Sequence, residues 1–392
     1  MYKLQSFSRA KLAETFSRLS SRLHWTGGRP SAPLGSRILT NTDDIFKHNM
    51  WDHVQWTEED KENARKKAKE NSCTHIPLEE QGKFDTEACQ YWDKFYKMHQ
   101  KKFFKDRKWL FLEFPELLPS GAKSQTTNGY LVDQQASHPQ LTGSSTDTDT
   151  RIQQHNRPTH RNTDTPSHQK ESCQGAAPEE TEALIQTPAF PGQHASFRIL
   201  EVFCSVFFLK LSVLLHRETD AYVYCCDFSP CAIQLVKDHP DYHDSVCHAF
   251  VHDICEERAS FPFPPQSLDV ILAVFVLSSI HPERLQGIVN RLSTYLKYGG
   301  IFLFRDYGRF DFSQLRFKKG RCLSENFYTR GDGTCVYFFT KEEIHDLFSI
   351  AGLEEIQNLE DRRLQVNRGK KVAMHRVWMQ SKYRKGYPPP PS

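Results

Sequence analysis

Apolar and polar positions alternate in blocks along the second half of the chain. Five apolar runs carry few charges and many β-branched or aromatic residues, which is typical of strands buried on both faces of a parallel sheet. These runs are RILEVF (198–203), AYVYCCDF (221–228), CHAFVHD (247–253), LDVILAVFVL (268–277) and GIFLFRDY (300–307). Amphipathic segments predict helices at Ser229–His239, Pro282–Leu296 and Lys341–Ala351, and later strands are expected at 365–367 and 375–382. This alternation predicts an α/β domain with a doubly wound sheet.

The segment before this domain, residues 34–119, is charged and predicts helices. Thr57 precedes three consecutive acids and is well placed to cap a helix that continues through EEDKENARKKAKENS. Residues 88–104 set six aromatic side chains among lysines. We therefore expect an N-terminal helical extension in front of the sheet.

Between these two parts, residues 120–192 are rich in Ser, Thr, Gln, His, Asp and Pro. A stretch so poor in apolar side chains cannot offset the entropy cost of ordering its backbone. We expect a disordered linker there, with the α/β domain over residues 193–384 and a disordered tail over residues 385–392.

Residues 1–33 form a basic leader. Its first 25 residues carry five basic side chains against one acid, Glu14, and apolar residues recur near helical spacing. This pattern resembles a mitochondrial transit peptide and predicts a location in the matrix. The alternative is an ordinary basic surface helix or tail on a cytoplasmic protein.

Composition narrows the function classes. The net charge is only +3, so affinity for nucleic acid must come from local clusters of Lys and Arg. The 11 cysteines are scattered and no CxxC pair recurs at zinc spacing, which favours free thiols and no metal site. No apolar run reaches the ~18 residues that span a bilayer, so no membrane partner is expected.

Three acids stand at the ends of consecutive predicted strands: Glu201, Asp227 and Asp253. In a doubly wound sheet, ligands bind beyond the carboxyl ends of the strands, where carboxylates accept hydrogen bonds from ribose or adenine. A single acid there is more often a cap or a solvated residue, but three in succession predict a nucleotide-cofactor site. The loop after the first strand lacks the glycines that such a site normally uses, since residues 203–207 are FCSVF.

Long motifs over residues 34–119 and 196–383 are shared with one enzyme family. They are HNMWDHVQW, YWDKFYKMHQKKFFKDRKWL, EFPEL, YCCDFS, AFVHDIC, LDVILAVFVLSSIHP, FRDYGRFDFSQLRFKKGRCLSENFYTRGDGT, YFFT and DRRLQVNR. On these motifs the chain resembles the tRNA 3-methylcytidine methyltransferases, which are class I, S-adenosylmethionine-dependent enzymes. The leader and MHRVW near the C-terminus make it most similar to the mitochondrial member.

The resemblance implies a class I (Rossmann-like) methyltransferase fold, S-adenosylmethionine as cofactor and tRNA as partner. An aminoacyl-tRNA synthetase or another tRNA-binding helper protein is a further expected partner. Carried onto this chain, the cofactor contacts are Trp92, Tyr96, Asp227 on the ribose, Asp253 near adenine, and Val274. Trp92 and Tyr96 share one helix face at i, i+4 spacing, and without the resemblance that spacing fits a core pair as well.

The chain departs from the family pattern at two turns. Phe203 stands where the family has its first glycine after the first strand, and its ring is expected to project toward the methionine end of the cofactor. Tyr298 replaces a proline before Gly299 and Gly300, which is a milder change because two glycines can still form the turn.

The chemistry implied by the resemblance needs alignment more than acid–base help. Cytosine N3 carries a lone pair that can attack a sulfonium methyl, and alignment can lower such a barrier by ~7–11 kcal/mol. Asp306 is the candidate carboxylate for stabilising the cationic product base, and Tyr307 is the candidate stacking residue. The alternative is that Arg305 and Asp306 form a structural ion pair. Since N3 lies on the Watson–Crick edge, the base must be unpaired, as in an anticodon loop, or flipped out.

Two basic stretches are candidates for holding RNA phosphates beside stacking aromatics. The candidate side chains are Lys101, Lys102, Lys105, Arg107, Lys108, Arg316, Lys318 and Lys319. A charge run is commonly only a solvated surface, and two such runs beside a methyltransferase frame favour the RNA interpretation.

Three hypotheses remain open on the sequence alone. The first is a mitochondrial tRNA methyltransferase that forms 3-methylcytidine in the anticodon loop. The second is a catalytically impaired RNA-binding variant, because the glycine-rich loop is replaced at Phe203–Phe207. The third, a nicotinamide-dependent oxidoreductase, is disfavoured by the absent glycine fingerprint.

Overall fold

The structure, a computed structural model, describes residues 37–99, 109–117, 189–203 and 220–388. The expected transit peptide and most of the expected linker lie outside these ranges, as do Lys101, Lys102, Lys105, Arg107 and Lys108. The described parts of residues 37–117 and 190–388 belong to one structural unit. Leu110 and Phe114 of the N-terminal extension share an apolar cluster with Ile199 of the α/β domain, so the two parts have a common core.

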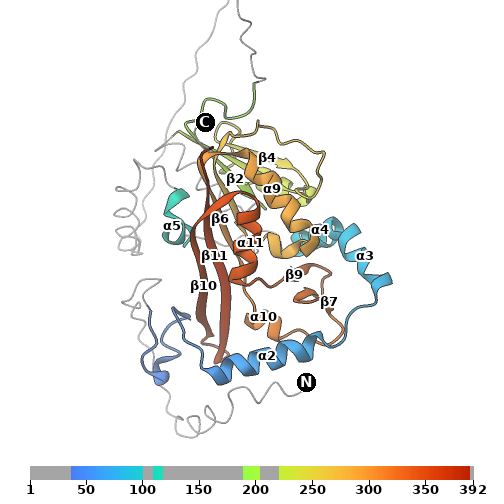
Figure 1. The fold of residues 1–392 in the computed structure, drawn as a ribbon, viewed down its shortest axis with the longest axis vertical. Coiled ribbons are helices and arrows are strands. Elements are labelled where there is room, and N and C mark those ends of the chain that lie inside the picture. Colours follow the sequence, from blue (N-terminus) through green and yellow to red (C-terminus); the bar gives the residue numbers. More distant parts are fainter. Residues whose placement is uncertain (1–36, 100–108, 118–188, 204–219, 389–392) are drawn as a thin grey trace, which may run out of the picture. The chain divides into compact units, whose positions relative to one another are not determined.

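Eight strands of the described chain form one sheet in the order β1-β10-β11-β6-β5-β2-β3-β4 (Figure 1). Their bounds are β1 (Met50–Trp51), β2 (Phe197–Val202), β3 (Ala221–Asp227), β4 (Cys247–Val251), β5 (Leu268–Val274), β6 (Leu296–Tyr307), β10 (Leu353–Asn367) and β11 (Val372–Lys385). Strands β6, β5, β2, β3 and β4 are parallel, whereas β1, β10 and β11 are antiparallel to their neighbours. The chain runs from β2 out to β4 and then returns to β5, so the strand order reverses between β2 and β5. The predicted doubly wound sheet is confirmed.

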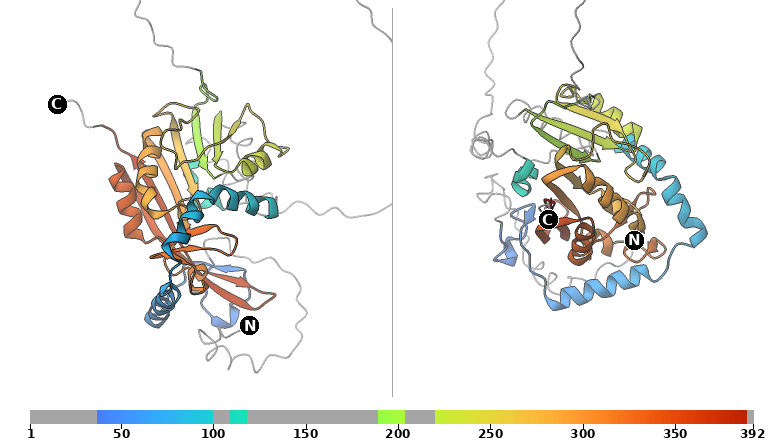
Figure 2. Two further views of the ribbon diagram at one scale, coloured as in Figure 1. Left: turned by 90° about the vertical axis from the view of Figure 1, so that its right-hand side faces the viewer. Right: turned by 45° about the horizontal axis from the view of Figure 1, so that its top comes forward.

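Both faces of the parallel strands are covered, which explains their nearly continuous apolar sequences. One face packs against α9 (Leu285–Tyr295) and α11 (Lys341–Ile350), which lie side by side in Figures 1 and 2. The other face packs against α8 (Pro230–Lys237) and α5 (Leu110–Glu113). Residues of one strand alternate between these two clusters, since Leu200 faces α9 and Ile199 faces α8.

The helix ends follow the expected capping chemistry. The hydroxyl of Ser229 accepts a hydrogen bond from the backbone N–H of Ala232, with Pro230 in the first position of α8. After α11, Gly352 adopts a left-handed conformation with φ of 75°. The helix expected over 282–296 is shorter, because a 3₁₀ turn at Pro282–Arg284 precedes α9 and Leu296 already begins β6.

The C-terminal hairpin of β10 and β11 is much longer than the two short strands expected there. The strands have 15 and 14 residues and pair along almost their whole length. Many of their positions carry charged side chains, which interrupts the apolar signal on which strand prediction depends.

The N-terminal extension is helical, as expected, but it also adds strand β1 to the edge of the sheet. Thr57 and Asp60 form a reciprocal capping box at the start of the first long helix, which confirms the predicted cap. The remaining elements are α2 (Glu58–Ser72), α3 (Leu78–Thr86), α4 (Ala88–His99), α10 (Phe312–Leu315), short 3₁₀ turns at Thr42–Asp44, Pro115–Leu117 and Leu277–Ser279, and a small antiparallel sheet of β7 (Cys322–Ser324), β8 (Phe327–Thr329) and β9 (Cys335–Tyr337). None of the described helices is long and apolar enough to cross a membrane.

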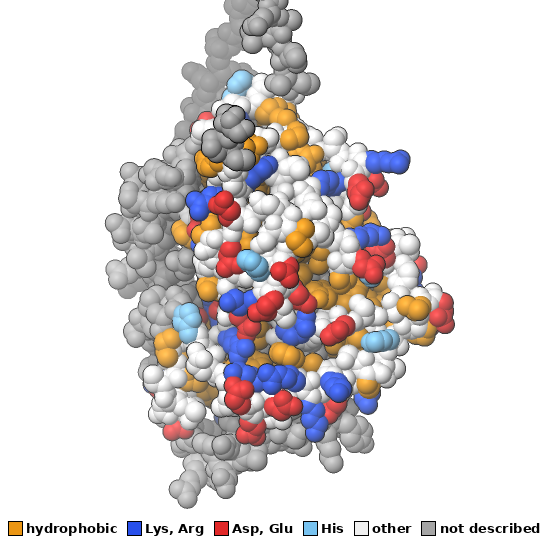
Figure 3. Space-filling model, viewed as in Figure 1, with side chains coloured by type: hydrophobic (Ala, Val, Ile, Leu, Met, Phe, Trp, Pro, Cys, Tyr) orange, Lys and Arg blue, Asp and Glu red, His pale blue; other side chains and the backbone are white. Residues whose placement is uncertain are grey.

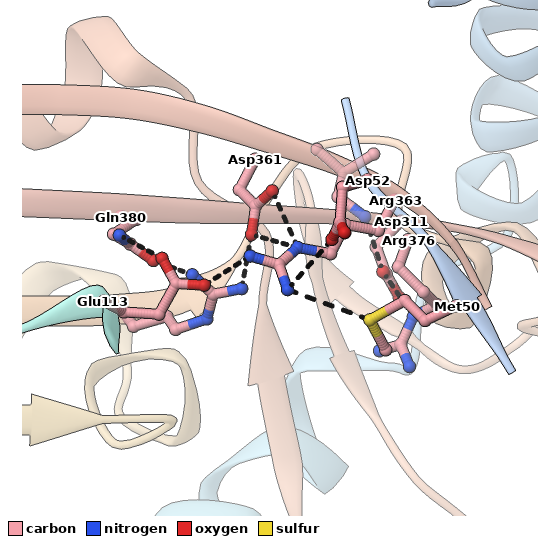
Figure 4. Close-up of polar contacts among 10 residues, drawn as sticks. Met50, Asp52, Glu113, Asp311, Asp361, Arg363, Arg376 and Gln380 are labelled. Atoms are coloured by element: carbon pink, nitrogen blue, oxygen red, sulfur yellow. Dashed lines mark hydrogen bonds and ion pairs between the residues drawn. The ribbon is translucent and has the colours of Figure 1, made fainter. Parts of the chain in front are cut away.

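A buried ion network ties the extension to the sheet (Figure 4). Asp361 on β10 bonds Arg305 of β6 at 2.5 Å and Arg363 of its own strand at 2.9 Å. Arg363 also pairs with Glu113 of α5 at 2.5 Å and with Asp52, just after β1, at 3.4 Å. The charges of Arg305, Arg363, Asp361 and Asp52 are at most 10% exposed, so each depends on its partners for compensation.

Candidate cofactor pocket

A cavity of about 430 Å³ opens at the carboxyl ends of β2, β3, β4 and β5. This is the point at which the strand order reverses, where doubly wound sheets bind their ligands. The corner between α3 and α4, the segment 279–284 and the small sheet supply the remaining walls. The volume lies in the range typical of small-molecule sites.

Phe203 lies where β2 ends, in a conformation that normally calls for glycine. Its φ is 73°, in the left-handed region, and its backbone N–H donates to the carbonyl of Cys226 on β3. The ring lines the cavity and packs edge-on against Trp92, with centroids 4.9 Å apart. The rings of Tyr96 and Phe228 lie 6.2 and 6.4 Å from it. At the position where the resemblance implies glycine, this chain therefore has a phenylalanine that forms an aromatic cluster at the carboxyl end of β2.

Asp227 ends β3 and is almost completely buried. One carboxylate oxygen accepts from the backbone N–H of Ser229 at 2.8 Å, and the other accepts from the hydroxyl of Tyr96 at 3.1 Å. Burial raises the pKa of Asp227 to about 7, although both hydrogen bonds act in the opposite direction. The structure thus brings two of the predicted cofactor contacts, Tyr96 and Asp227, into direct contact, and Asp227 lines the cavity.

The end of β4 contributes two neighbouring polar residues. Asp253 lines the cavity and is exposed, and one of its oxygens accepts from the backbone N–H of Cys255 at 2.8 Å. His252 also lines the cavity but is buried, and the sequence analysis did not select it. Its place beside Asp253 in the motif AFVHDIC was the available signal.

Trp92, Tyr96 and Val274 do not lie among the lining residues, and both aromatic residues are buried in one apolar cluster. Trp92 reaches the site through the ring of Phe203. Val274 points into the apolar cluster on the α8 face, and Val276, two residues later, lines the cavity in its place. The cofactor contacts expected of Trp92, Tyr96 and Val274 stay predictions.

Asp306 and Tyr307 end β6 outside the cavity lining. Asp306 is fully buried, and its two oxygens accept from the backbone N–H groups of Ser278 at 2.9 Å and Tyr307 at 2.8 Å. Burial raises the pKa of Asp306 to about 6. The carboxylate therefore holds the turn that carries Ser278, beside cavity-lining Ser279, instead of facing the cavity itself. The alternative ion pair is not formed, because Arg305 bonds Asp361.

The exposed basic loop of Arg316, Lys318 and Lys319 docks on α2. The side-chain amide of Asn71 on α2 donates to the carbonyls of Gln314 and Leu315 at the start of this loop. Figure 3 shows Lys and Arg side chains mixed with acids over the region where Figure 1 draws α2 and α10. Because basic and acidic side chains are intermixed there, the surface charge does not by itself mark a phosphate-binding site. Phosphate binding by these three residues stays a prediction.

The turn at residues 297–300 forms with tyrosine at position 298, where the resemblance implies proline. Gly299 adopts a φ of 80°, and Gly300 lies so close to the carbonyl of Lys297 that a Cβ atom would be only 2.9 Å away. The two glycines make the close approach, and Tyr298 stacks on Tyr387 at the surface.

The cavity suits the adenosyl portion of the expected cofactor. Asp227 and Asp253 place carboxylate oxygens at two adjacent strand ends, and the Nε2 atom of His252 is buried without a hydrogen-bond partner. Buried polar atoms without partners are uncommon in folded proteins. Phe203 lines the same cavity at the end of β2, where the family resemblance implies glycine.

The raised pKa of Asp227 leads to a testable pH dependence. An acid whose pKa rises from 3.8 to about 7 on folding binds its proton more tightly in the folded state, so stability falls as the pH rises between these values. We expect Asp227→Asn, which cannot ionise, to gain stability relative to the unchanged protein by a few kcal/mol from pH 5 to pH 8, at about 1.4 kcal/mol per pKa unit. Urea unfolding at both pH values measures this difference, and a difference that does not vary with pH contradicts the assignment.

A family model described as "Methyltransferase domain" matches residues 209–358. Among solved structures, a putative S-adenosylmethionine-dependent methyltransferase from Listeria monocytogenes has 15% identity and a TM-score of 0.38, over 49% of this chain and 92% of its own.

Curated relatives are much more similar. The tRNA N(3)-cytidine methyltransferase METTL2 of Danio rerio is 49% identical over 90% of this chain and 88% of its own length. METTL2B of Homo sapiens, of the same description, is 46% identical over 89% and 92%. The mitochondrial METTL8 of Homo sapiens is 43% identical over 66% and 91%. The family expected from the motifs is confirmed: this chain belongs to the tRNA N(3)-cytidine methyltransferases.

Proposed function

We propose that this protein methylates N3 of a cytidine in the anticodon loop of a tRNA, within mitochondria. S-adenosylmethionine is the methyl donor of its family. The observation that carries the proposal is the cavity at the β2–β5 switch point, lined by Asp227 and Asp253, in a chain 49% identical to a tRNA N(3)-cytidine methyltransferase. The N-terminal leader supports the mitochondrial location, as does the similarity to METTL8.

The residues divide the binding of the donor between them. Asp227 would accept hydrogen bonds from the ribose hydroxyls, and Tyr96 and Ser229 hold its carboxylate in place. Asp253 would accept from the adenine amino group at the neighbouring strand end. The cofactor supplies an electrophilic methyl group on a sulfonium centre.

The protein's contribution to the methyl transfer is alignment. Cytosine N3 is a neutral nucleophile, so no residue has to remove a proton from it before attack. An unpaired or flipped-out base is required because N3 lies on the Watson–Crick edge. Asp306 supports the rim of the cavity by fixing the turn at Ser278, and Tyr307 packs beside it against Phe275 with centroids 5.0 Å apart. Through these contacts both residues would fix the segment 275–278, beside which the target base would bind.

On the RNA side, Arg316, Lys318 and Lys319 provide exposed cations on a loop anchored to α2. Such cations bind phosphate without reading sequence. A tRNA-binding helper protein, such as an aminoacyl-tRNA synthetase, would then supply selectivity among tRNA species.

Nucleoside mass spectrometry tests the proposed function. In cells that lack the protein, 3-methylcytidine in mitochondrial tRNA is expected to fall, and the unchanged chain should restore it. Asp227→Asn should not, because an amide cannot accept two ribose hydrogen bonds as a carboxylate does. Loss of the modification from cytosolic tRNA alone would retain the reaction and reject the mitochondrial location. Unchanged 3-methylcytidine in both pools would reject the proposed reaction.

A further inference from the structure

Arg330 is a partly exposed arginine with unused hydrogen-bond donors. It follows β8 directly and begins the turn to β9. Among the residues that the structure describes, its Nη1 atom alone forms hydrogen bonds, to the carbonyl of Cys335 at 3.0 Å and the hydroxyl oxygen of Thr334 at 3.3 Å. The Nε and Nη2 atoms are not among the buried polar atoms, so their N–H donors remain open to a ligand.

The positive charge of Arg330 is not neutralised by any acid of the described chain. Four other arginines that are largely shielded from solvent each form an ion pair with a carboxylate: Arg305, Arg309, Arg363 and Arg376. Removing a charge from water costs free energy unless an opposite charge compensates it. Arg330 is therefore well suited to receive an anion that belongs to a ligand.

Arg330 lies beside the part of the site where the target base would bind. Its guanidinium carbon is 5.7 Å from the centre of the ring of Tyr307, over one face of that ring. The carbonyl that it bonds belongs to Cys335, which lines the cavity. Strand β9 lies against the 3₁₀ turn at Leu277–Ser279, the turn that Asp306 holds. The guanidinium is thus close to the cavity but outside its lining.

The turn that carries Arg330 is firmly fixed. The backbone N–H of Arg330 donates to the carbonyl of Thr334 at 2.7 Å. Gly333, at a φ of 89°, packs so closely against Tyr91 of α4 that a Cβ atom would lie 2.4 Å from its ring. A side chain anchored on such a turn, with Nη1 already bonded, loses little conformational entropy when a ligand binds.

We propose that the guanidinium of Arg330 binds a phosphate adjacent to the target cytidine and thereby positions that nucleotide for methylation. The proposal rests on the proposed function, since it takes RNA to be the substrate. A guanidinium matches the geometry of phosphate oxygens and forms strong charge-assisted hydrogen bonds with them. A phosphate is a better partner than the base itself, because methylation at N3 makes the base cationic and a facing guanidinium would repel it.

Methylation kinetics with a modified substrate test the proposal. The substrate is the tRNA that loses 3-methylcytidine in cells lacking the protein, prepared with an uncharged methylphosphonate on the 5′ or the 3′ side of the target cytidine. For the unchanged full-length protein, one of the two replacements should lower kcat/KM by about 10- to 100-fold, the range of a charge-assisted hydrogen bond. Arg330→Gln should lose a similar factor on unmodified tRNA, and the same methylphosphonate should then have little further effect.

Two further variants separate phosphate binding from a structural role. Arg330→Lys keeps the charge and should recover part of both the activity and the sensitivity to the methylphosphonate. Arg198→Gln is the matched control, since Arg198 also lies over an aromatic ring, that of Phe190, and bonds backbone carbonyls, but at the amino end of β2. It should keep the full sensitivity to the methylphosphonate.

The outcomes distinguish this proposal from the proposed function. If each methylphosphonate lowers kcat/KM by the same factor in Arg330→Gln as in the unchanged protein, Arg330 does not bind either phosphate, and the proposal is overturned while the methyltransferase activity stands. If the unchanged protein methylates no cytidine of this tRNA, both the proposal and the proposed function are overturned.

Discussion

Replacing Asp361 by asparagine is expected to lower the free energy of unfolding by about 3–5 kcal/mol. The carboxylate lies between the guanidinium groups of Arg305 and Arg363, whose side chains are only 3% and 9% exposed. An amide of the same shape keeps the packing but leaves two buried positive charges with less compensation. Glu113 and Asp52 still neutralise Arg363, whereas Arg305 has only the neutral Gln380 as a further hydrogen-bonding side chain among the contacts the structure describes.

Urea unfolding of Asp361→Asn beside Glu360→Gln measures this effect. Glu360 is the preceding residue and pairs with Arg362, but both of those side chains remain about 30% exposed. An exposed pair of this kind contributes about 0–1 kcal/mol. Similar losses in the two variants would show that burial does not set the strength of the Asp361 network.

The parallel part of the fold could be predicted because burial on both faces leaves a direct trace in the sequence. Strands β2 to β5 read as mostly apolar runs with few charges for that reason. The hairpin of β10 and β11 leaves no such trace. Its buried positions include Arg363 and Lys382, which are satisfied by Glu113 and Glu116 far away in the sequence. The local sequence around Arg363 and Lys382 does not indicate that their ion-pair partners lie about 250 positions earlier in the chain.

The candidate site shows the same division. Acids at strand ends could be found from the sequence because topology alone brings those ends together. The family resemblance selected Tyr96 and Asp227 as separate cofactor contacts, and the hydrogen bond between them was not predicted. Tyr96 is fully buried, as the core interpretation of its spacing also allowed. His252 was missed because a histidine after a strand has no distinctive pattern, and only its unsatisfied nitrogen marks it out. Asp306 was selected as the carboxylate beside the product base, and that role stays a prediction; the hydrogen bond from the backbone N–H of Ser278 to its carboxylate could not be foreseen from the sequence.

Phe203→Gly is expected to tighten the binding of S-adenosylhomocysteine by about ten- to a hundredfold. A cofactor that approaches the backbone at the end of β2 must displace the ring of Phe203 from its contacts with Trp92, Tyr96 and Phe228. Each aromatic pair contributes roughly 0.5–1.5 kcal/mol, and about 1.4 kcal/mol corresponds to a tenfold change in affinity. Removing the ring in advance removes that cost from the binding step. Calorimetric titration of both proteins gives the ratio directly.

Phe203→Ala separates the ring from the backbone. Both small residues open the cavity, so both should bind the ligand more tightly than the unchanged protein. Alanine keeps the strain of a φ of 73°, which costs a residue with a Cβ atom about 1–2 kcal/mol, whereas glycine adopts this conformation freely. The glycine variant should therefore be the more stable of the two in urea. If neither variant gains affinity, the ring of Phe203 does not obstruct the cofactor, and this prediction is wrong.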